Sequence, residues 1–129
     1  MRQIKVKRMS VLLLVSISII LGVFGQLSMK KGMNAIGPIG LKNIFSSEIF
    51  SIVLQKFVFL GFVLYIFSSM LWLVALSQEE VSFIYPLISV GYIITAILGK
   101  FLFNENLTFF RFFGILLICS GVYLIVLKI

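Results

Sequence analysis

The sequence predicts an all-α integral membrane protein, a single domain of four transmembrane helices with short loops that covers residues 1–129. Hydrophobic residues make up 61% of the chain and charged residues only 12%, whereas a soluble domain carries roughly 25% charged residues because its surface faces water. The mean hydropathy of +1.21 agrees with this class. The apolar residues also form uninterrupted runs, and one membrane span needs about 20 of them. The chain has room for four such runs.

The first helix is expected at about residues 10–30, after a basic segment. A basic segment before an apolar run is also typical of a secretory signal. This run, however, is too long for a signal core, and no small-residue cleavage pattern follows it. We therefore expect no cleavable signal peptide. The sequence Lys30-Lys31-Gly32 predicts that the helix stops there, at a membrane surface.

The other three helices are expected at about residues 51–77, 81–103 and 108–127. The connection before the second helix contains Gly37-Pro38-Ile39-Gly40, a turn signal, and then apolar residues spaced as in a short interfacial helix. The remaining connections are so short that consecutive helices are expected to be antiparallel neighbours. Acidic residues in Gln78-Glu79-Glu80 suit the start of the third helix. Thr108 is the expected N-cap of the last helix.

Basic residues lie at the ends of the apolar runs, so the net charge of +7 indicates contact with anionic lipid headgroups and not nucleic acid. Because connections alternate sides, the two sides carry nearly equal basic charge: Arg2, Lys5, Lys7, Arg8 and Lys128 against Lys30, Lys31, Lys42, Lys56, Lys100 and Arg111. The positive-inside rule depends on a bias between the sides. We therefore expect either cytoplasmic termini, held by the N-terminal charges, or insertion in both orientations with antiparallel pairing.

All four acidic residues, Glu48, Glu79, Glu80 and Glu105, fall in connections between the predicted spans. An acid inside a span is the usual sign of proton or cation coupling, so the sequence argues against a proton-driven exporter of cationic drugs. The chain has no histidine and one cysteine, so we expect neither a metal site nor a cofactor. It also lacks a nucleophile–base pair and a phosphate-binding glycine loop, and we expect no enzyme activity.

Small and hydroxyl side chains recur at helical spacing on three of the spans. They are Ser18, Gly22 and Gly25 with Gln26 beside them, then Gly61, Tyr65, Ser68 and Trp72, and then Tyr85, Ser89, Tyr92, Ala96 and Gly99. For the first of these faces close helix packing is the favoured interpretation. The two tyrosines of the third helix are too bulky for it, and their hydroxyls need partners away from lipid. We expect a groove there, which Pro86 can help to shape by removing a backbone donor.

Gly114 and Gly121 are seven residues apart on the fourth helix and therefore share one side of it. Glycine allows another helix to approach closely. One four-helix chain buries few surfaces, so we expect a second chain on this face and a dimeric working unit.

The segment Gly114-Ile-Leu-Leu-Ile-Cys-Ser-Gly121-Val122 resembles the last helix of small multidrug resistance proteins, where such a face forms the dimer. Over nearly all four spans the chain resembles the drug/metabolite transporter superfamily in its single-module, EamA-like form. A closer resemblance is to the small flippase subunits that move aminoarabinose linked to undecaprenyl phosphate across the inner membrane. The residues that carry it are Gly25-Gln26-Leu27 with Lys30, Leu71-Trp72-Leu73, Tyr85-Pro86 with Ser89, and Glu105.

In small multidrug resistance proteins the first helix carries an essential glutamate, and aligning Met29-Lys30 with that family places Gly22 at its position. The resemblance therefore implies an inner-membrane carrier that moves a lipid-linked sugar, or a related polyprenyl phosphate lipid, between leaflets. An exporter of small metabolites or drugs and a non-transporting membrane partner subunit are the alternatives. The resemblance also implies membrane lipids as partners, and either a homodimer or a heterodimer with a related four-helix chain.

The expected substrate-binding residues combine the polar faces, the matched motifs and the cations at the helix ends. Cations near the headgroups can contact phosphate, although a single basic residue there more commonly extends along apolar surface to reach water. The full set is Gln26, Lys30, Tyr65, Trp72, Tyr85, Ser89, Tyr92, Lys100 and Arg111, with Gly114 and Gly121 as the expected dimer face.

Overall fold

The computed structural model describes residues 2–127, with side chains from Arg8 onward, and this part of the chain is helical without strands. The helices are α1 (Arg2–Ile36), α2 (Leu41–Ile44), α3 (Glu48–Leu54), α4 (Lys56–Leu76), α5 (Val81–Leu87), α6 (Ser89–Phe103) and α7 (Phe109–Leu127). Four stretches are long and apolar enough to cross a membrane: Arg8–Ile36, Lys56–Leu76, Val81–Phe103 and Phe109–Leu127. The predicted fold class, an all-α protein of four transmembrane helices, is confirmed.

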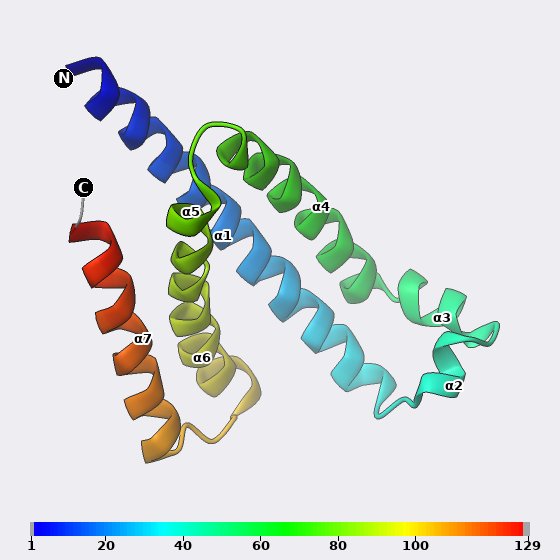
Figure 1. Cartoon of the computed structure of the whole chain (residues 1–129). Coiled ribbons are helices and arrows are strands. Elements are labelled where there is room, and N and C mark those ends of the chain that lie inside the picture. Colours follow the sequence, from blue (N-terminus) through cyan, green and yellow to red (C-terminus); the bar gives the residue numbers. More distant parts are fainter. Residues whose placement is uncertain (1, 128–129) are drawn as a thin grey trace.

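Helix α1 is the centre of the arrangement, because α4 packs along one side of it and α6 along another (Figure 1). Helix α7 lies against α5 and α6. The start of α1, the α4–α5 turn and the end of α7 lie at one end of the molecule, and α2, α3 and the α6–α7 loop lie at the other. Successive spans are antiparallel, as predicted. Helix α4 meets the third span only near their turn, so these two consecutive spans are not close neighbours along their length.

Helix α1 does not stop after Gly32 as predicted but continues to Ile36. Gly32 is buried against α4, where a Cβ atom would come within 2.9 Å of the Val58 backbone nitrogen. The glycine therefore serves close packing, which outweighs its weak helix propensity. The helix ends where Gly37 adopts a φ of 94° and its N–H donates to the carbonyl of Met33 at 2.9 Å. Glycine adopts that left-handed conformation without steric cost.

The connection from α1 to α4 holds two short helices, α2 and α3, where the sequence predicted one short interfacial helix. Gln55 follows α3 and caps α4, because its Oε1 accepts from the backbone N–H groups of Phe57 at 2.8 Å and Val58 at 3.0 Å. The second span accordingly begins at Lys56 and not near residue 51. At the last span the predicted N-cap is confirmed, since the Thr108 hydroxyl oxygen accepts from the Arg111 N–H at 3.4 Å.

The third span was predicted as one continuous helix, but it is interrupted at Ile88, between α5 and α6. Pro86 has no N–H to donate within the helix, and its ring crowds the carbonyl four residues earlier. The backbone tightens around the break, where the N–H of Ile88 donates to the Tyr85 carbonyl at 3.1 Å and the N–H of Gly91 donates to the Ile88 carbonyl at 2.8 Å. The Ser89 hydroxyl donates to the carbonyl of Pro86.

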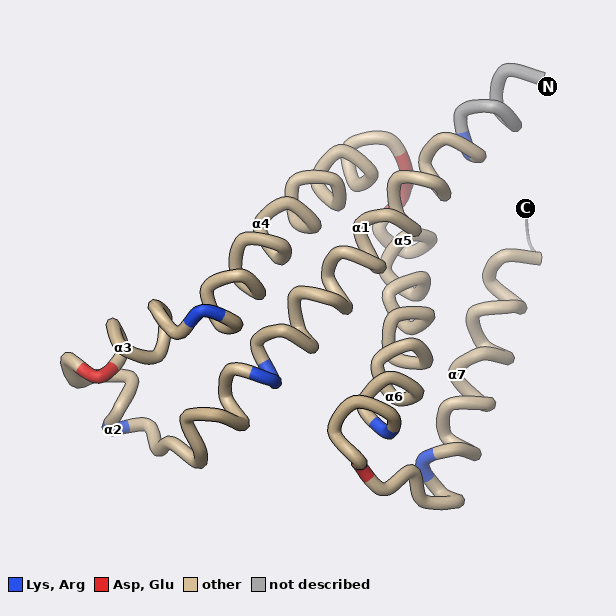
Figure 2. Tube along the Cα trace, turned by 180° about the vertical axis from the view of Figure 1, so that it is seen from behind, with Lys and Arg blue, Asp and Glu red and all other residues tan. Residues whose placement is uncertain are grey.

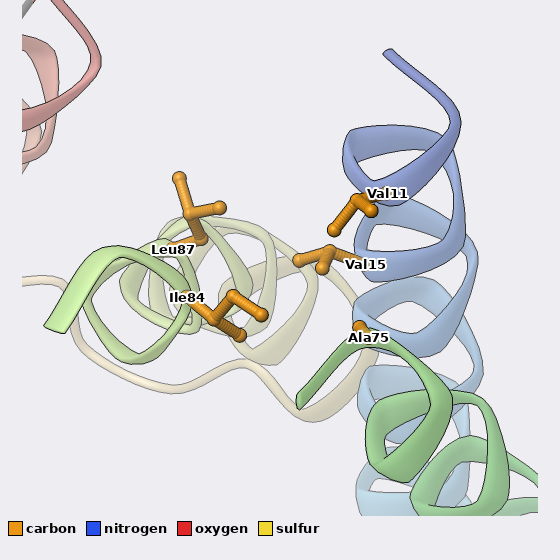
Figure 3. Packing of buried hydrophobic residues seen from close by; sticks show 5 residues of the cluster. All are labelled: Val11, Val15, Ala75, Ile84 and Leu87. Atoms are coloured by element: carbon orange, nitrogen blue, oxygen red, sulfur yellow. The ribbon is translucent and has the colours of Figure 1, made fainter. Parts of the chain in front are cut away.

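The apolar core lies at the end of the molecule where α1 begins (Figure 3). Val11 and Val15 of α1 face Ile84 and Leu87 of α5, and Ala75 of α4 lies beside them. These five side chains are at most 6% exposed. The core therefore ties α5 to the pair formed by α1 and α4.

Small residues let α1 and α4 approach closely next to this core, farther along α1. The Ser18 hydroxyl donates to the Ser68 carbonyl at 2.8 Å, and the Ser68 hydroxyl donates to the Ser18 carbonyl at 2.7 Å. A Cβ atom on Gly61 would lie 2.6 Å from the carbonyl oxygen of Gly25. The face that contains Ser18 and Gly25 was expected to serve packing, and the structure places it in this contact.

Helix α7 is the least integrated span, since none of its residues is buried. A Cβ atom added at Gly114 or at Gly121 would meet nothing within 4 Å. Within the described chain these glycines therefore make no close contact with another helix. A second chain remains the expected partner of this face.

Gly121→Leu is expected to weaken association without unfolding the monomer, because the added side chain has free space in the single chain but would block a second helix. Cross-linking of the wild type and of the variant in lipid measures this, with Leu124→Ala as a control on the same exposed helix. A protein that stays strictly monomeric, with the variant indistinguishable from the wild type, would contradict the expectation.

Charged residues lie at both ends of the bundle (Figure 2). The side chains of Arg2, Lys5, Lys7 and Lys128 are outside the described part of the chain. At the end where α1 begins, Arg8 Nε lies 3.9 Å from Glu79 Oε1 of the α4–α5 turn. Of the basic residues predicted for this end, only Arg8 has a described side chain, so the balance of basic charge between the two sides stays a prediction.

Neutralising the four N-terminal basic residues is expected to shift the orientation of the protein in the membrane, because the two sides differ by so little basic charge. The variant combines Arg2→Gln, Lys5→Gln, Lys7→Gln and Arg8→Gln. C-terminal tags read by reporters that are active on one side only measure the population. An unchanged population would indicate that another feature, such as a partner chain, determines orientation.

Candidate functional site

A cavity of about 290 Å³ lies between α1, α4 and the α5–α6 span. It occurs where α4 and the third span, which both contact α1, diverge from each other. Its lining residues are Ser18, Ile19, Gly22, Val23, Gln26, Tyr65, Ser68, Ser69, Trp72, Tyr85, Ile88, Gly91 and Tyr92. Tyr65, Tyr85 and Tyr92 are 45%, 54% and 57% exposed, so the cavity is open to the surroundings of the bundle.

The structure brings five of the predicted substrate-binding residues together in this cavity. They come from three spans: Gln26 from α1, Tyr65 and Trp72 from α4, Tyr85 from α5 and Tyr92 from α6. The Trp72 and Tyr85 rings meet edge to face, with centroids 5.8 Å apart and planes at 78°. This contact joins α4 to α5 across the cavity, which holds the two rings in place.

The floor of the cavity is built from small residues. A Cβ atom at Gly91 would come within 3.1 Å of Ile19 Cγ2, and one at Gly22 within 3.0 Å of the Ser68 hydroxyl oxygen. Both glycines thus let neighbouring helices approach closely, and a side chain at either position would be crowded. Gly22, which the resemblance to small multidrug resistance proteins aligns with their glutamate, lines this cavity.

The cavity is polar but uncharged. Its described lining offers hydroxyl, amide and aromatic groups and contains no acidic or basic side chain. Ser18 and Ser68 already use their hydroxyls in mutual bonds, and the Ser69 hydroxyl donates to the Tyr65 carbonyl at 2.8 Å. The Gln26 amide and the tyrosine hydroxyls are other polar side-chain groups of the lining, and they are available to a bound molecule. Such a lining can bind the hydroxyl groups of a sugar, while the rings of Trp72 and the tyrosines pack against its apolar faces.

Lys30 lies one helical turn beyond Gln26 on the same face of α1. Its Nζ is 3.9 Å from Glu105 Oε1 of the α6–α7 loop, and the two side chains are 51% and 49% exposed. An ion pair this exposed contributes little to stability. Lys30 can therefore exchange Glu105 for another anion at small cost.

The other predicted site residues lie outside the cavity. The Ser89 hydroxyl donates to the Pro86 carbonyl at the break in its own span. Lys100 is exposed in the last turn of α6. Arg111 Nη1 donates to the Asn106 carbonyl at 3.0 Å, and its side chain lines a separate cavity of about 300 Å³ that also includes Gly114.

Sequence reasoning missed Ser69, Ile88 and Gly91 as parts of the lining. The signal available for Gly91 was its helical position, because it directly precedes Tyr92 and lies one turn before Thr95. Within the described residues, no group of three or more His, Cys, Asp or Glu side chains is placed to hold a metal ion.

The sequence pattern of the EamA-like transporter family matches residues 1–127. A relative from Sodalis glossinidius (strain morsitans), named "Probable 4-amino-4-deoxy-L-arabinose-phosphoundecaprenol flippase subunit ArnF", is 38% identical over 69 residues, 52% of this chain and 53% of the relative. A relative with the same name from Proteus mirabilis (strain HI4320) is 39% identical over 70 residues, 53% of each chain.

A third relative, from Pseudomonas fluorescens (strain Pf0-1), is named "Probable 4-amino-4-deoxy-L-arabinose-phosphoundecaprenol flippase subunit ArnE". It is 34% identical over 56 residues, 43% of this chain and 49% of the relative. The chain thus spans about half the length of the curated relatives it matches. No solved structure matches it. The family match confirms the resemblance read from the motifs: this chain is a multi-pass membrane protein that belongs to the EamA-like transporter family.

Proposed function

We propose that the protein is a flippase subunit that moves a lipid-linked sugar, or a related polyprenyl phosphate lipid, between membrane leaflets. The observation that carries the proposal is the uncharged cavity of hydroxyl, amide and aromatic groups, open at its side and continued along α1 by Lys30. The names of the relatives, which describe probable flippase subunits for a phosphoundecaprenol-linked aminosugar, support the same substrate class.

The groups of the cavity match the parts of such a substrate. A sugar head loses water when it enters the hydrocarbon region, at a cost of several kcal/mol for each polar group that is left without a partner. Gln26, Tyr85 and Tyr92 offer replacement hydrogen bonds. In this proposal Lys30 contacts the phosphate once it leaves Glu105, and the polyprenyl chain remains in the lipid because the cavity is open.

The working unit in this proposal is a dimer that uses the exposed face of α7, including Gly114 and Gly121. The partner is either a second copy or a related four-helix chain. The word "subunit" in the names of the relatives supports pairing with a related chain.

The test is translocation of an enzymatically detectable polyprenyl phosphate sugar in proteoliposomes, compared with uptake of a cationic dye driven by a proton gradient. We expect lipid movement, either from the chain alone or after a related chain is added. Proton-driven dye uptake without lipid movement would replace the proposal by the small-molecule exporter. Lipid movement that needs a related chain but is unaffected by Gln26→Ala and Tyr92→Ala in this chain would indicate a non-transporting subunit.

A further inference from the structure

A second, larger groove of about 470 Å³ lies along α1 and shares no lining residue with the candidate cavity. It lies between α1, the first half of α4 and the end of α6. Its lining is mainly apolar, with three polar side chains, in the set Phe24, Leu27, Ser28, Lys31, Asn34, Phe57, Leu60, Leu64, Leu102 and Phe103. The Ser28 hydroxyl is already bonded, since it donates to the Phe57 carbonyl at 2.7 Å.

Two ammonium groups lie near one ring of this groove. Lys31 Nζ lies 4.4 Å, and Lys56 Nζ 5.1 Å, from the centre of the Phe57 ring. A ring face attracts a cation, but it does not neutralise the charge. Two like charges near one ring also repel each other, and an anion placed beside both would remove that repulsion.

Neither lysine is neutralised within the described part of the chain. Both ion pairs there involve other basic residues, Arg8 with Glu79 and Lys30 with Glu105. Glu48, the other acidic residue at this end of the bundle, accepts a hydrogen bond from the Asn43 amide. Lys31 and Lys56 therefore form an unneutralised cationic pair.

Both lysines lie near ends of candidate spans, because Lys31 is five residues before the end of the first span, so we expect them near the membrane surface. The second span begins at Lys56. Leu64 lines the groove eight residues later, which corresponds to about 12 Å along the helix. A ligand that fits both parts needs an anionic head and an alkyl chain. A small soluble anion would use only the lysines.

We propose that this groove is a binding site for an anionic lipid, with its phosphate between Lys31 and Lys56 and one alkyl chain along Leu60 and Leu64. Asn34, which is exposed three residues beyond Lys31, adds an amide donor for the head. The site is separate from the candidate cavity, and it does not depend on which molecule the protein transports.

The test measures lipid retained by the purified full chain in native mass spectrometry, after exchange with dioleoyl phosphatidylglycerol or with dioleoyl phosphatidylcholine. The two lipids have the same chains and differ in net head charge. We expect the wild type to prefer phosphatidylglycerol. Lys31→Gln with Lys56→Gln should lower its affinity roughly tenfold or more, since each lysine near a headgroup contributes about a fivefold factor.

Lys42→Gln is the matched control, because Lys42 is exposed on α2 at the same end and lines neither groove. It should leave the preference unchanged. Equal losses in Lys42→Gln and in the double variant would indicate a diffuse surface charge and would overturn the proposal, as would a wild type with no preference between the lipids.

Leu60→Trp tests the chain part of the site, because it fills the groove without changing charge. It should lower retention of both lipids, whereas Leu73→Trp, on an exposed part of α4 outside both cavities, should not. Unchanged retention in Leu60→Trp would show that no chain occupies the groove. Thermal unfolding of each variant identifies any that fail to fold.

Discussion

Gly61→Leu is expected to destabilise the protein more than any other single change at the surface of α4. The Gly61 Cα faces the backbone of α1, where even a Cβ atom would lie 2.6 Å from the Gly25 carbonyl oxygen and 2.9 Å from the Met29 nitrogen. Backbone atoms cannot turn aside as a flexible side chain can. The two helices must therefore separate, and the expected loss is about 3 kcal/mol of unfolding free energy, the upper end of what overpacking typically costs.

Separation of α1 from α4 would also strain the paired hydroxyls of Ser18 and Ser68, which reach across the same contact. Denaturant titration in detergent, followed by tryptophan fluorescence of Trp72, measures the loss. Gly61→Ala should also be destabilising, because even its Cβ is crowded by the backbone of α1. Gly40→Ala is its control, because a Cβ at Gly40 makes only an ordinary contact of 3.6 Å with Asn43 Oδ1. Equal stability of these two alanine variants would contradict the packing argument.

Lys30→Ala is expected to reduce translocation of a polyprenyl phosphate sugar by about tenfold or more. A charge-assisted hydrogen bond typically contributes about 1.5–3 kcal/mol, and each 1.4 kcal/mol is about a factor of ten. Tyr85→Phe should have a smaller effect because it removes only one hydroxyl. Arg111→Ala should also do less, since Arg111 lines another cavity and donates to the Asn106 carbonyl.

The measurement is initial translocation rate in proteoliposomes that contain matched amounts of folded protein. Loss of the exposed Lys30–Glu105 pair should change stability by less than about 1 kcal/mol, so a slow variant would still be folded. Lys42→Ala is the charge-matched control. If both lysine variants transport at the wild-type rate, Lys30 does not contact the phosphate.

The spans could be predicted from the sequence because hydropathy is averaged over about 20 residues and one residue changes it little. Thr108 was also predictable, because an N-cap depends on its own side chain and the next turn. The end of α1 was not. Gly32 looks like a stop in the sequence, but its contact with Val58 of another helix makes it a packing residue.

The candidate cavity was predictable only in part for the same reason. Helical spacing shows that Tyr85 and Tyr92 share a face, and their bulk predicts a groove. It does not show which helix lies opposite, so Gly91 and Ser69 were overlooked. The spacing also cannot show that Arg111 faces a different cavity, because that depends on how α7 packs beside α6.

The interruption at Ile88 separates two parts of the third span, α5 and α6, that have different roles. Ile84 and Leu87 precede it and belong to the buried core, whereas Tyr92 follows it and lines the cavity. A rotation of a few backbone dihedrals at Ile88 would swing Tyr92 relative to Tyr85 and leave the core contacts of α5 in place. A change of backbone dihedrals at this break beside Pro86 would therefore alter the width of the cavity without disrupting the apolar cluster beside it.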